Sequence, residues 1–140
     1  MKKKLSLLIV DDDADDRNLF TEAVKDVDEN ITCAEVNNGE QALKFLKDGG
    51  NVLPDCIFLD LRMPRLGGKK CLQALKSDER LKHIPVYIYT TSRELEESRE
   101  LKAMGAFHFI SKPNNEEDVY YLVALALEEL LIQSEADNLN

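Results

Sequence analysis

The amino-acid sequence predicts an α/β fold, with helices on both faces of one parallel five-stranded sheet. Apolar runs of four to six residues alternate along the chain with longer segments of helical period, and this alternation is typical of repeated βα units. Crossovers between parallel strands are almost always right-handed, so the expected product is a doubly wound, three-layer sandwich. At 140 residues, the chain fits one such domain.

The first two βα units occupy the N-terminal third of the chain. The apolar run 5–10 is read as a buried strand. An amphipathic helix is predicted to follow from Asp13 to about Val27. The alternating segment 31–36 predicts the second strand, and Gly49-Gly50 ends the helix after it.

The third and fourth units are separated by prolines, glycines and polar connections. Residues 56–59 are the third predicted strand, and a loop containing Gly67-Gly68 leads from it into a short helix that ends near Lys76. The fourth strand is predicted at 86–89. Hydroxyl side chains after it offer N-cap oxygens for a helix at about 93–104.

The fifth unit completes the predicted sheet. Gly105 ends the preceding helix, and residues 106–110 form the last strand. A final helix is predicted from about 115 to 132, and a polar tail covers 133–140. The predicted domain therefore covers residues 1–132, and we expect no output domain.

Charge and hydropathy exclude several classes of function. The chain has 18 basic and 27 acidic residues, a net charge of −9, which opposes binding to nucleic acids or anionic membranes. The run Lys2-Lys3-Lys4 precedes too short an apolar segment for a signal peptide, and no segment is long enough for a membrane helix. We therefore expect a cytoplasmic protein. Its widely spaced cysteines, Cys33, Cys56 and Cys71, are expected to be reduced core residues.

Polar residues follow four of the predicted strands. Asp11 and Asp12 end the first strand, Asp60 ends the third, Thr90 ends the fourth and Lys112 follows the fifth. Ligands of open parallel sheets bind at the carboxyl ends of the strands, so one crevice is expected to receive all of them. Carboxylate oxygens favour a hard cation, and we predict Mg²⁺, with Mn²⁺ as a substitute.

Each of these residues also has a purely structural interpretation. Asp13 and Asp15 are best read as helix N-caps, and a threonine after a strand is often a cap as well. A lysine before a proline is often solvated surface. The functional interpretation depends on Asp12, Thr90 and Lys112 occurring together with the other strand-end carboxylates.

This set of residues resembles the receiver domain of two-component response regulators, in the single-domain, CheY-like type, over about residues 5–132. The resemblance implies a flavodoxin-like (βα)5 fold with strand order 2-1-3-4-5. The matching segments are Val10-Asp11-Asp12, the run from Phe58 to Pro64 with Gly67-Gly68, Ile84-Pro85 leading to Thr90, and Gly105-Ala106 leading to Ser111-Lys112-Pro113.

The resemblance implies a role for each site residue. Asp60 would accept a phosphoryl group from a phosphohistidine on a sensor histidine kinase. Asp12, Asp60 and the backbone carbonyl of Arg62 would hold Mg²⁺, with Asp11 assisting. Lys112 and the Thr90 hydroxyl would each contact a phosphoryl oxygen. The expected protein is a signalling switch that catalyses only its own phosphorylation and dephosphorylation.

The resemblance also identifies residues that tune and transmit the signal. Phe109 occupies the aromatic switch position that responds to Thr90, and it departs from the tyrosine common in the family. Arg62 and Ser92 occupy positions that tune dephosphorylation, and the long Arg62 side chain predicts slow loss of the phosphoryl group.

The last helix is predicted to carry the output surface. Nearly every residue from Val119 to Leu127 is apolar, which is more than one buried stripe requires. We predict a homodimer or partner-docking surface built from the fourth helix, the fifth strand and the fifth helix. Its expected contact residues are Tyr120, Tyr121, Val123 and Leu127.

The sequence leaves the output partner open. A downstream protein target and a histidine phosphotransfer protein both fit, and the long polar loop before the fourth strand is similar to regulators paired with phytochrome-type histidine kinases. A haloacid-dehalogenase-type phosphatase would need an aspartate in place of Arg62, and an FMN-binding protein would need a Gly, Ser and Thr loop in place of Asp11 to Asp13. A scaffold that acts without phosphorylation stays an alternative.

Overall fold

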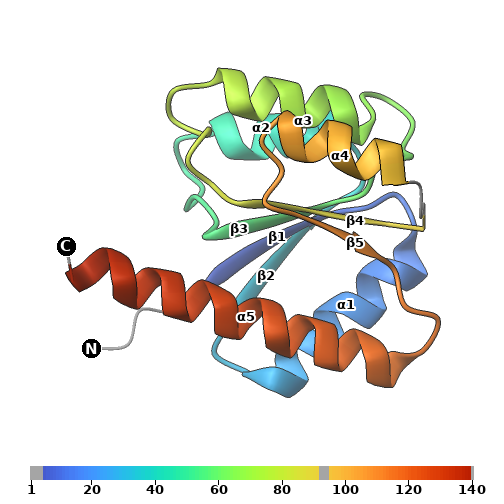
Figure 1. Ribbon diagram of the computed structural model, residues 1–140, viewed down its shortest axis with the longest axis vertical. Coiled ribbons are helices and arrows are strands. Elements are labelled where there is room, and N and C mark those ends of the chain that lie inside the picture. Colours follow the sequence, from blue (N-terminus) through green and yellow to red (C-terminus); the bar gives the residue numbers. More distant parts are fainter. Residues whose placement is uncertain (1–4, 92–94, 140) are drawn as a thin grey trace.

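The computed structural model describes residues 5–91 and 95–139, with side chains up to residue 133. Strands and helices alternate through these residues (Figure 1). The elements are β1 (Ser6–Val10), α1 (Ala14–Val27), β2 (Thr32–Val36), α2 (Gly39–Lys47), β3 (Cys56–Leu59), α3 (Gly68–Ser77), β4 (Val86–Thr90), α4 (Leu95–Ala103), β5 (His108–Ser111) and α5 (Glu116–Leu139).

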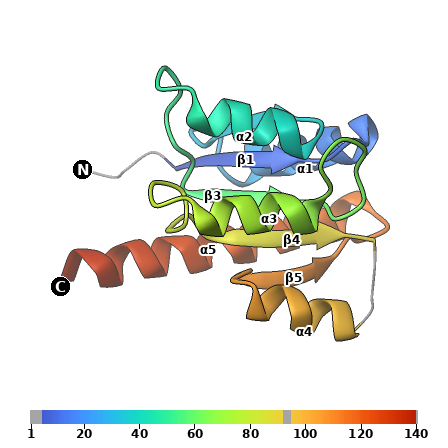
Figure 2. The ribbon, with the colours of Figure 1, turned by 90° about the horizontal axis from the view of Figure 1, so that it is seen from above.

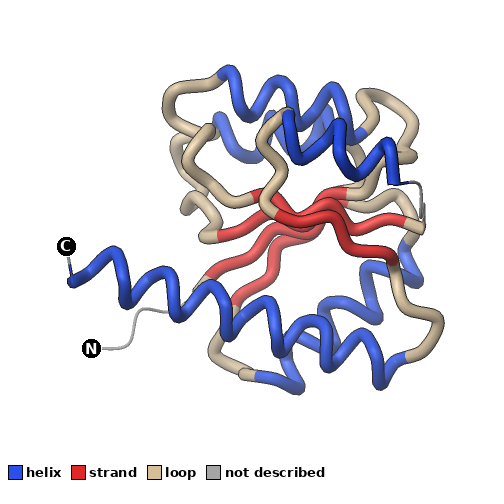
Figure 3. The backbone as a smooth tube through the Cα atoms, viewed as in Figure 1, coloured by secondary structure: helices blue, strands red, loops and turns tan. Residues whose placement is uncertain are grey.

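The five strands form one parallel sheet in the order β2-β1-β3-β4-β5, which confirms the predicted fold and strand order. Helices α1 and α5 cover one face, and α2, α3 and α4 cover the other (Figures 1 and 2). The coloured tube of Figure 3 shows the sheet as the middle layer. All carboxyl ends of the strands therefore point to one edge.

Two hydrophobic clusters fill the space between the sheet and its helices. On the α1 and α5 side, Phe20 packs against Phe58 with ring centroids 4.6 Å apart, and Val123 is fully buried beside them in the same cluster. On the other side, apolar residues of β1, β3 and β4 pack against Leu46, Leu72 and other residues of α2, α3 and α4. Burial on both faces explains why β1, β3 and β4 are almost continuous apolar runs.

Side-chain caps fix the starts of two helices. An Asp13 carboxylate oxygen accepts hydrogen bonds from the backbone N–H groups of Asp15 and Asp16 at 2.9 and 3.1 Å. Asn38 caps α2 in the same way through Gln41. The prediction that Asp13 is an N-cap is therefore confirmed, whereas the same prediction for Asp15 is wrong, because Asp15 lies in the first turn of α1.

Two element boundaries differ from the sequence prediction by more than one residue. The N–H of Ala106 bonds to the carbonyl of Leu101, so this residue belongs to the turn that caps α4, and β5 begins later, at His108. Helix α5 does not end near Ile132 but continues to Leu139, because the segment 133–139 contains no glycine or proline to stop it. The predicted start of α4 at residue 93 lies outside the described residues.

The cysteines behave as predicted from their spacing. Cys56 and Cys71 are buried, Cys33 is half-buried, and all three thiols are free. Burial raises the pKa of Cys33 and of Cys71 to about 12, so both thiols stay protonated at neutral pH. Among the described helices, none is both long and apolar enough to cross a membrane.

Candidate functional site

The carboxyl edge of the sheet brings the predicted site residues together. The backbone ladder continues past the strand ends: the N–H of Asp60 donates to the carbonyl of Val10 at 2.9 Å, and the N–H of Lys112 donates to the carbonyl of Thr90 at 2.7 Å. Asp11 is held likewise by the carbonyl of Val36 at 3.1 Å. These backbone hydrogen bonds place the three residues side by side at one edge of the sheet.

Three carboxylates form a cluster at this edge. Asp11, Asp12 and Asp60 each offer an oxygen, and these oxygens lie within 4.8 Å of one another. Asp11 and Asp60 are buried and Asp12 is exposed, so the cluster opens to solvent on one side. A set of oxygen ligands with an open side suits a hard divalent cation that keeps bound water.

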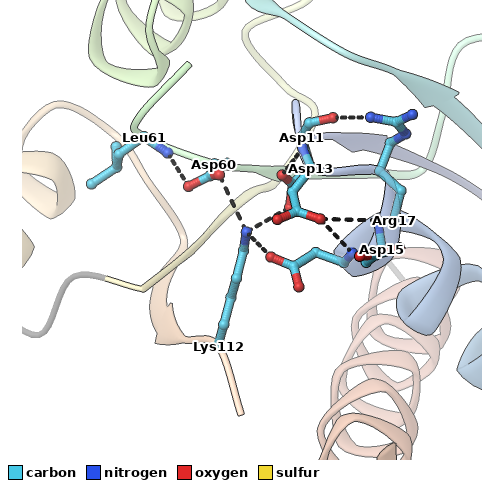
Figure 4. Close-up of polar contacts among 8 residues, drawn as sticks. Asp11, Asp13, Asp15, Arg17, Asp60, Leu61 and Lys112 are labelled. Atoms are coloured by element: carbon cyan, nitrogen blue, oxygen red, sulfur yellow. Dashed lines mark hydrogen bonds and ion pairs between the residues drawn. The ribbon is translucent and has the colours of Figure 1, made fainter. Parts of the chain in front are cut away.

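Lys112 lies at the centre of the acidic groups (Figure 4). Its ammonium is 2.7 Å from an Asp11 oxygen and 3.2 Å from an Asp60 oxygen. A third carboxylate, that of Asp16, lies 2.8 Å away, and Asp16 was not among the predicted site residues. Because Asp16 belongs to the first turn of α1, which follows β1 at the same sheet edge, its place in the acidic run was the available signal.

Burial and neighbouring charges shift the pKa values of Asp11 and Lys112 in opposite directions. Burial raises the pKa of Asp11 from 3.8 to about 6, although the hydrogen bonds from Lys112 and from the Asp13 N–H partly offset this rise. For Lys112, burial alone would lower the pKa, but the hydrogen bonds to Asp11 and Asp16 outweigh it and raise the pKa. Lys112 therefore stays charged, whereas the Asp11 carboxylate is destabilised by its buried position.

This destabilisation predicts that Asp11→Asn stabilises the metal-free protein in a pH-dependent way. The folded pKa of about 6 exceeds the unfolded value of 3.8, so the folded wild type binds more protons in this window and loses stability as pH rises through it. The variant lacks this loss. Urea unfolding in chelator should show equal stability near pH 4 and an advantage for the variant at pH 7 of at most about 3 kcal/mol. If the variant were instead more stable than wild type mainly at low pH, a raised pKa of Asp11 in the folded protein would be contradicted.

The Thr90 hydroxyl is fully buried at the end of β4. Among the described residues it has no hydrogen-bond partner, which is uncommon for a buried hydroxyl. It therefore offers a free donor at the site edge. Phe109 pairs with Ile88 on the neighbouring strand and packs, half-buried, against the α4 side of the core.

The Arg62 side chain extends to α4. Its guanidinium lies 3.7 Å from a carboxylate oxygen of Glu97, and a second ion pair, between Lys69 and Glu100, bridges α3 and α4 nearby. These residues line a small polar cavity of about 140 Å³. Ser92, the second predicted tuning residue, lies outside the described residues.

Gly68 allows the loop after β3 to pack against the site. A Cβ at this position would lie 2.7 Å from the Leu61 Cα and would contact the carbonyl oxygen of Asp60. Because no side chain fits there, glycine permits the close approach that places α3 behind Asp60.

Of the four residues predicted to form an interface on α5, two are exposed, as an interface residue must be, and two are buried. Tyr120 and Tyr121 are exposed, but Val123 and Leu127 are buried in the core cluster shared with α1. The near-continuous apolar sequence hid which residues face the sheet, because both faces of the helix are apolar. Leu125, Leu131 and Ile132 are exposed and belong to the outer face.

Comparison with known proteins identifies the family. The family model described as "Response regulator receiver domain" matches residues 7–124. The chain is 33% identical to chemotaxis protein CheY-3 of Vibrio cholerae over 81% of this chain and 84% of that protein. It is 31% identical to regulatory protein AtoC of Escherichia coli over 96% of this chain, but it spans only 28% of that longer protein.

Solved structures agree with this assignment. The phosphorylated cyanobacterial phytochrome response regulator RcpA has a TM-score of 0.84 and 27% identity, covering 92% of this chain and 95% of its own. The Mn²⁺-bound form of response regulator Rcp1 has a TM-score of 0.78 and 26% identity, covering 86% and 89%. With a matched family model over most of its length, the chain belongs to the response regulator receiver domain family.

Proposed function

We propose that this receiver domain is a phosphorylation switch in which Asp60 accepts a phosphoryl group from a phosphohistidine of a sensor histidine kinase. The observation that carries the proposal is the buried Asp60 carboxylate, held beside Asp11 and Lys112 at the sheet edge. The unpartnered Thr90 hydroxyl at the same edge adds a donor for a phosphoryl oxygen.

In the proposed reaction, an Asp60 carboxylate oxygen attacks phosphorus while the phosphorus–nitrogen bond of the phosphohistidine breaks. The leaving imidazole nitrogen keeps the electron pair of that bond, and the product is an acyl phosphate on Asp60. The protein contributes mainly position and charge. The Leu61 N–H holds one Asp60 oxygen at 2.8 Å, and Lys112 offsets the charge that the phosphoryl group adds.

The acidic cluster fits a divalent cation. Asp11, Asp12 and Asp60 would hold it, and the backbone carbonyl of Arg62 is our proposed further ligand. We propose Mg²⁺ because the donors are all oxygen, and Mn²⁺ is the metal found in Rcp1. When bound, the cation neutralises negative charge shared by the carboxylates and the phosphoryl oxygens.

The test of this function is the intact mass after incubation with acetyl phosphate. Wild type should gain one phosphoryl group with Mg²⁺ and none with excess chelator. Asp60→Asn should gain none under either condition. An unmodified wild type in Mg²⁺ would instead favour a scaffold that acts without phosphorylation.

The proposed partners follow from the receiver family and from the similar structures. RcpA is a phytochrome response regulator, and we propose a phytochrome-type histidine kinase as the phosphoryl donor. The output is a protein contact, with either a downstream target or a histidine phosphotransfer protein. Transfer of the phosphoryl group from Asp60 to a histidine phosphotransfer protein would identify the second kind of output partner.

The predicted homodimer is a separate proposal, and sedimentation of the protein measures its oligomeric state.

The proposed signal passes from Asp60 to α4 and β5. A phosphoryl oxygen would draw the Thr90 hydroxyl inward, because that hydroxyl has no competing partner among the described residues. Phe109 would then repack toward the space that Thr90 leaves. As a phenylalanine it has no hydroxyl to bond, so the proposed rearrangement depends on packing alone.

Arg62 is predicted to lengthen the life of the phosphoryl group. Replacing it with asparagine should speed dephosphorylation about threefold, the size expected for a solvent-exposed charge contact of under 1 kcal/mol. Because Glu97 holds the guanidinium in the unphosphorylated protein, Glu97→Gln should free Arg62 and slow dephosphorylation. The measurement is the decay of the phosphoryl adduct after the donor is removed.

The matched control for Arg62 is Lys69→Asn. It removes the same charge and breaks the neighbouring ion pair to Glu100, on the same cavity. Its adduct should decay at the wild-type rate. An unchanged lifetime in Arg62→Asn would show that this side chain does not shield the phosphoryl group.

A further inference from the structure

The Lys112 ammonium has more acidic neighbours than its proposed contact with a phosphoryl oxygen requires. It donates a hydrogen bond to Asp16 at 2.8 Å and a longer one to Asp60 at 3.2 Å, and its ion pair with Asp11 spans 2.7 Å. An ammonium has three N–H donors, so these three carboxylates can engage all of them. Asp16 is the member of this set to which the proposed function gives no role.

Asp16 differs from the other two partners of Lys112 in its relation to the proposed cation. Asp11 and Asp60 belong to the cluster of carboxylates whose oxygens lie within 4.8 Å of one another, and Asp16 is not a member of that cluster. In the proposed reaction, Asp11 and Asp60 share their charge with a cation, and Asp60 also receives the phosphoryl group. Asp16 is then the carboxylate whose oxygens stay available to Lys112.

The first turn of α1 holds Asp16 in place. The Asp16 N–H donates to the Asp13 carboxylate at 3.1 Å, as part of the helix N-cap. The Arg17 guanidinium donates to the Asp11 carbonyl at 2.6 Å, and this bond ties the same turn to the end of β1. The Asp16 side chain is 33% exposed, whereas the Lys112 side chain is only 7% exposed. Asp16 is therefore a fixed acceptor beside an ammonium that is almost buried.

Lys112 is held at both ends. Its backbone N–H donates to the Thr90 carbonyl at 2.7 Å, and its ammonium lies 5.8 Å from the centroid of the buried Tyr89 ring. Because the lysine stem between these ends is flexible, the direction of the ammonium depends on the acceptors at its tip. The hydrogen bond to Asp16 supplies such an acceptor while Asp60 reacts.

We propose that Asp16 is a positioning residue for phosphoryl transfer, which keeps the Lys112 ammonium directed at Asp60. The inference deepens the proposed function and rests on it. As the Asp60 oxygen attacks phosphorus, two N–H groups of Lys112 stay with Asp11 and Asp16, and the third passes from the Asp60 oxygen to a phosphoryl oxygen. Lys112 then offsets the added charge without a change in its side-chain conformation.

An acidic residue in the first turn of a helix also has a purely structural interpretation. Its charge interacts favourably with the partial positive charge of the helix N-terminus. Asp15 shares this position, because it lies in the same turn of α1 and is exposed. Its carboxylate makes no hydrogen bond or ion pair among the described residues. Asp15→Ala is therefore the matched control for Asp16→Ala, since it removes the same charge from the same turn.

The first measurement needs neither cation nor phosphoryl group. Proton–nitrogen NMR of the metal-free protein detects a lysine ammonium that hydrogen bonds shield from water, and the Lys112 signal is assigned through its side-chain carbons. Asp16→Ala should make hydrogen exchange of this ammonium about tenfold faster, because it removes a hydrogen bond between charged groups. Asp15→Ala should keep the wild-type exchange rate. An unchanged rate in Asp16→Ala would overturn the proposal, because Asp16 would then not hold the ammonium.

The second measurement is the rate of modification by acetyl phosphate at saturating Mg²⁺. Asp16→Ala should react about tenfold more slowly than wild type. The Mg²⁺ concentration that gives half the maximal rate should change by less than about twofold, because Asp16 is not a member of the metal cluster. Asp16→Asn keeps an oxygen that accepts a hydrogen bond from Lys112 and should recover part of the rate. Asp15→Ala should react like wild type.

Each contrary result has a distinct meaning. A wild-type or higher rate in Asp16→Ala, or an equal loss in Asp15→Ala, would overturn the positioning role and leave the proposed function intact. A loss in Asp16→Ala that higher Mg²⁺ removes would overturn it in favour of a role for Asp16 in binding the cation. A wild type that acetyl phosphate does not modify would overturn the proposed function, and this inference with it.

Discussion

Asp60→Asn will show no phosphoryl adduct under conditions in which wild type is modified. The replacement keeps the shape of the side chain and its hydrogen bond from the Leu61 N–H, but it removes the nucleophilic carboxylate. It also removes one of the three acidic groups that would hold the cation. Both changes act on the same step, so we expect complete loss of the adduct and not a slower reaction.

The acidic run after β1 supplies graded controls for Asp60. Asp13→Asn removes a carboxylate from the same run but keeps an equally good N-cap, so it should be phosphorylated like wild type. Asp12→Asn removes the exposed member of the cluster and should need more Mg²⁺ to reach the same extent of modification. An adduct that persists in Asp60→Asn would assign the phosphoryl group to another residue.

The parts of the site that follow strand ends could be predicted from the sequence. Asp11, Asp60, Thr90 and Lys112 each come at or just after the end of a strand, and parallel strands bring those ends to one edge. The cap at Asp13 was predictable for a similar reason, because its role is local. Position along the chain was enough wherever the backbone alone determines where a side chain lies.

The parts that depend on packing between elements could not be predicted. Asp16 meets Lys112 and Glu97 meets Arg62, each from a distant part of the chain, so position in the sequence does not show which residue either one contacts. Val123 and Leu127 were assigned to the surface because α5 is apolar on both faces. Which face turns inward is decided by α1 and the sheet, and no periodicity in the helix itself reports it.

The largest predicted effect on stability belongs to Lys112. The Lys112→Met variant keeps much of the side-chain volume but leaves Asp11, which is 0% exposed, without its counter-charge. Removal of one partner from a buried ion pair typically costs about 3–5 kcal/mol. We expect a loss of this size in urea unfolding at pH 7 in chelator. Lys69→Met, which breaks only the exposed pair to Glu100, should lose under about 1 kcal/mol.

Binding of a proton or of a cation to the acidic cluster should reduce the stability that the Lys112→Met variant loses. Lys112 lowers the pKa of Asp11, so without it this pKa should rise further above the unfolded value of 3.8. The folded variant then binds more protons than the unfolded chain, and its stability falls as pH rises. The difference in stability between wild type and the variant is therefore smallest near pH 4 and largest near pH 7. Mg²⁺ binds only the folded carboxylate cluster and should restore part of the loss at pH 7. A deficit that is independent of both pH and Mg²⁺ would mean that Lys112 stabilises the fold by packing, and that the acidic cluster exerts no repulsion in its absence.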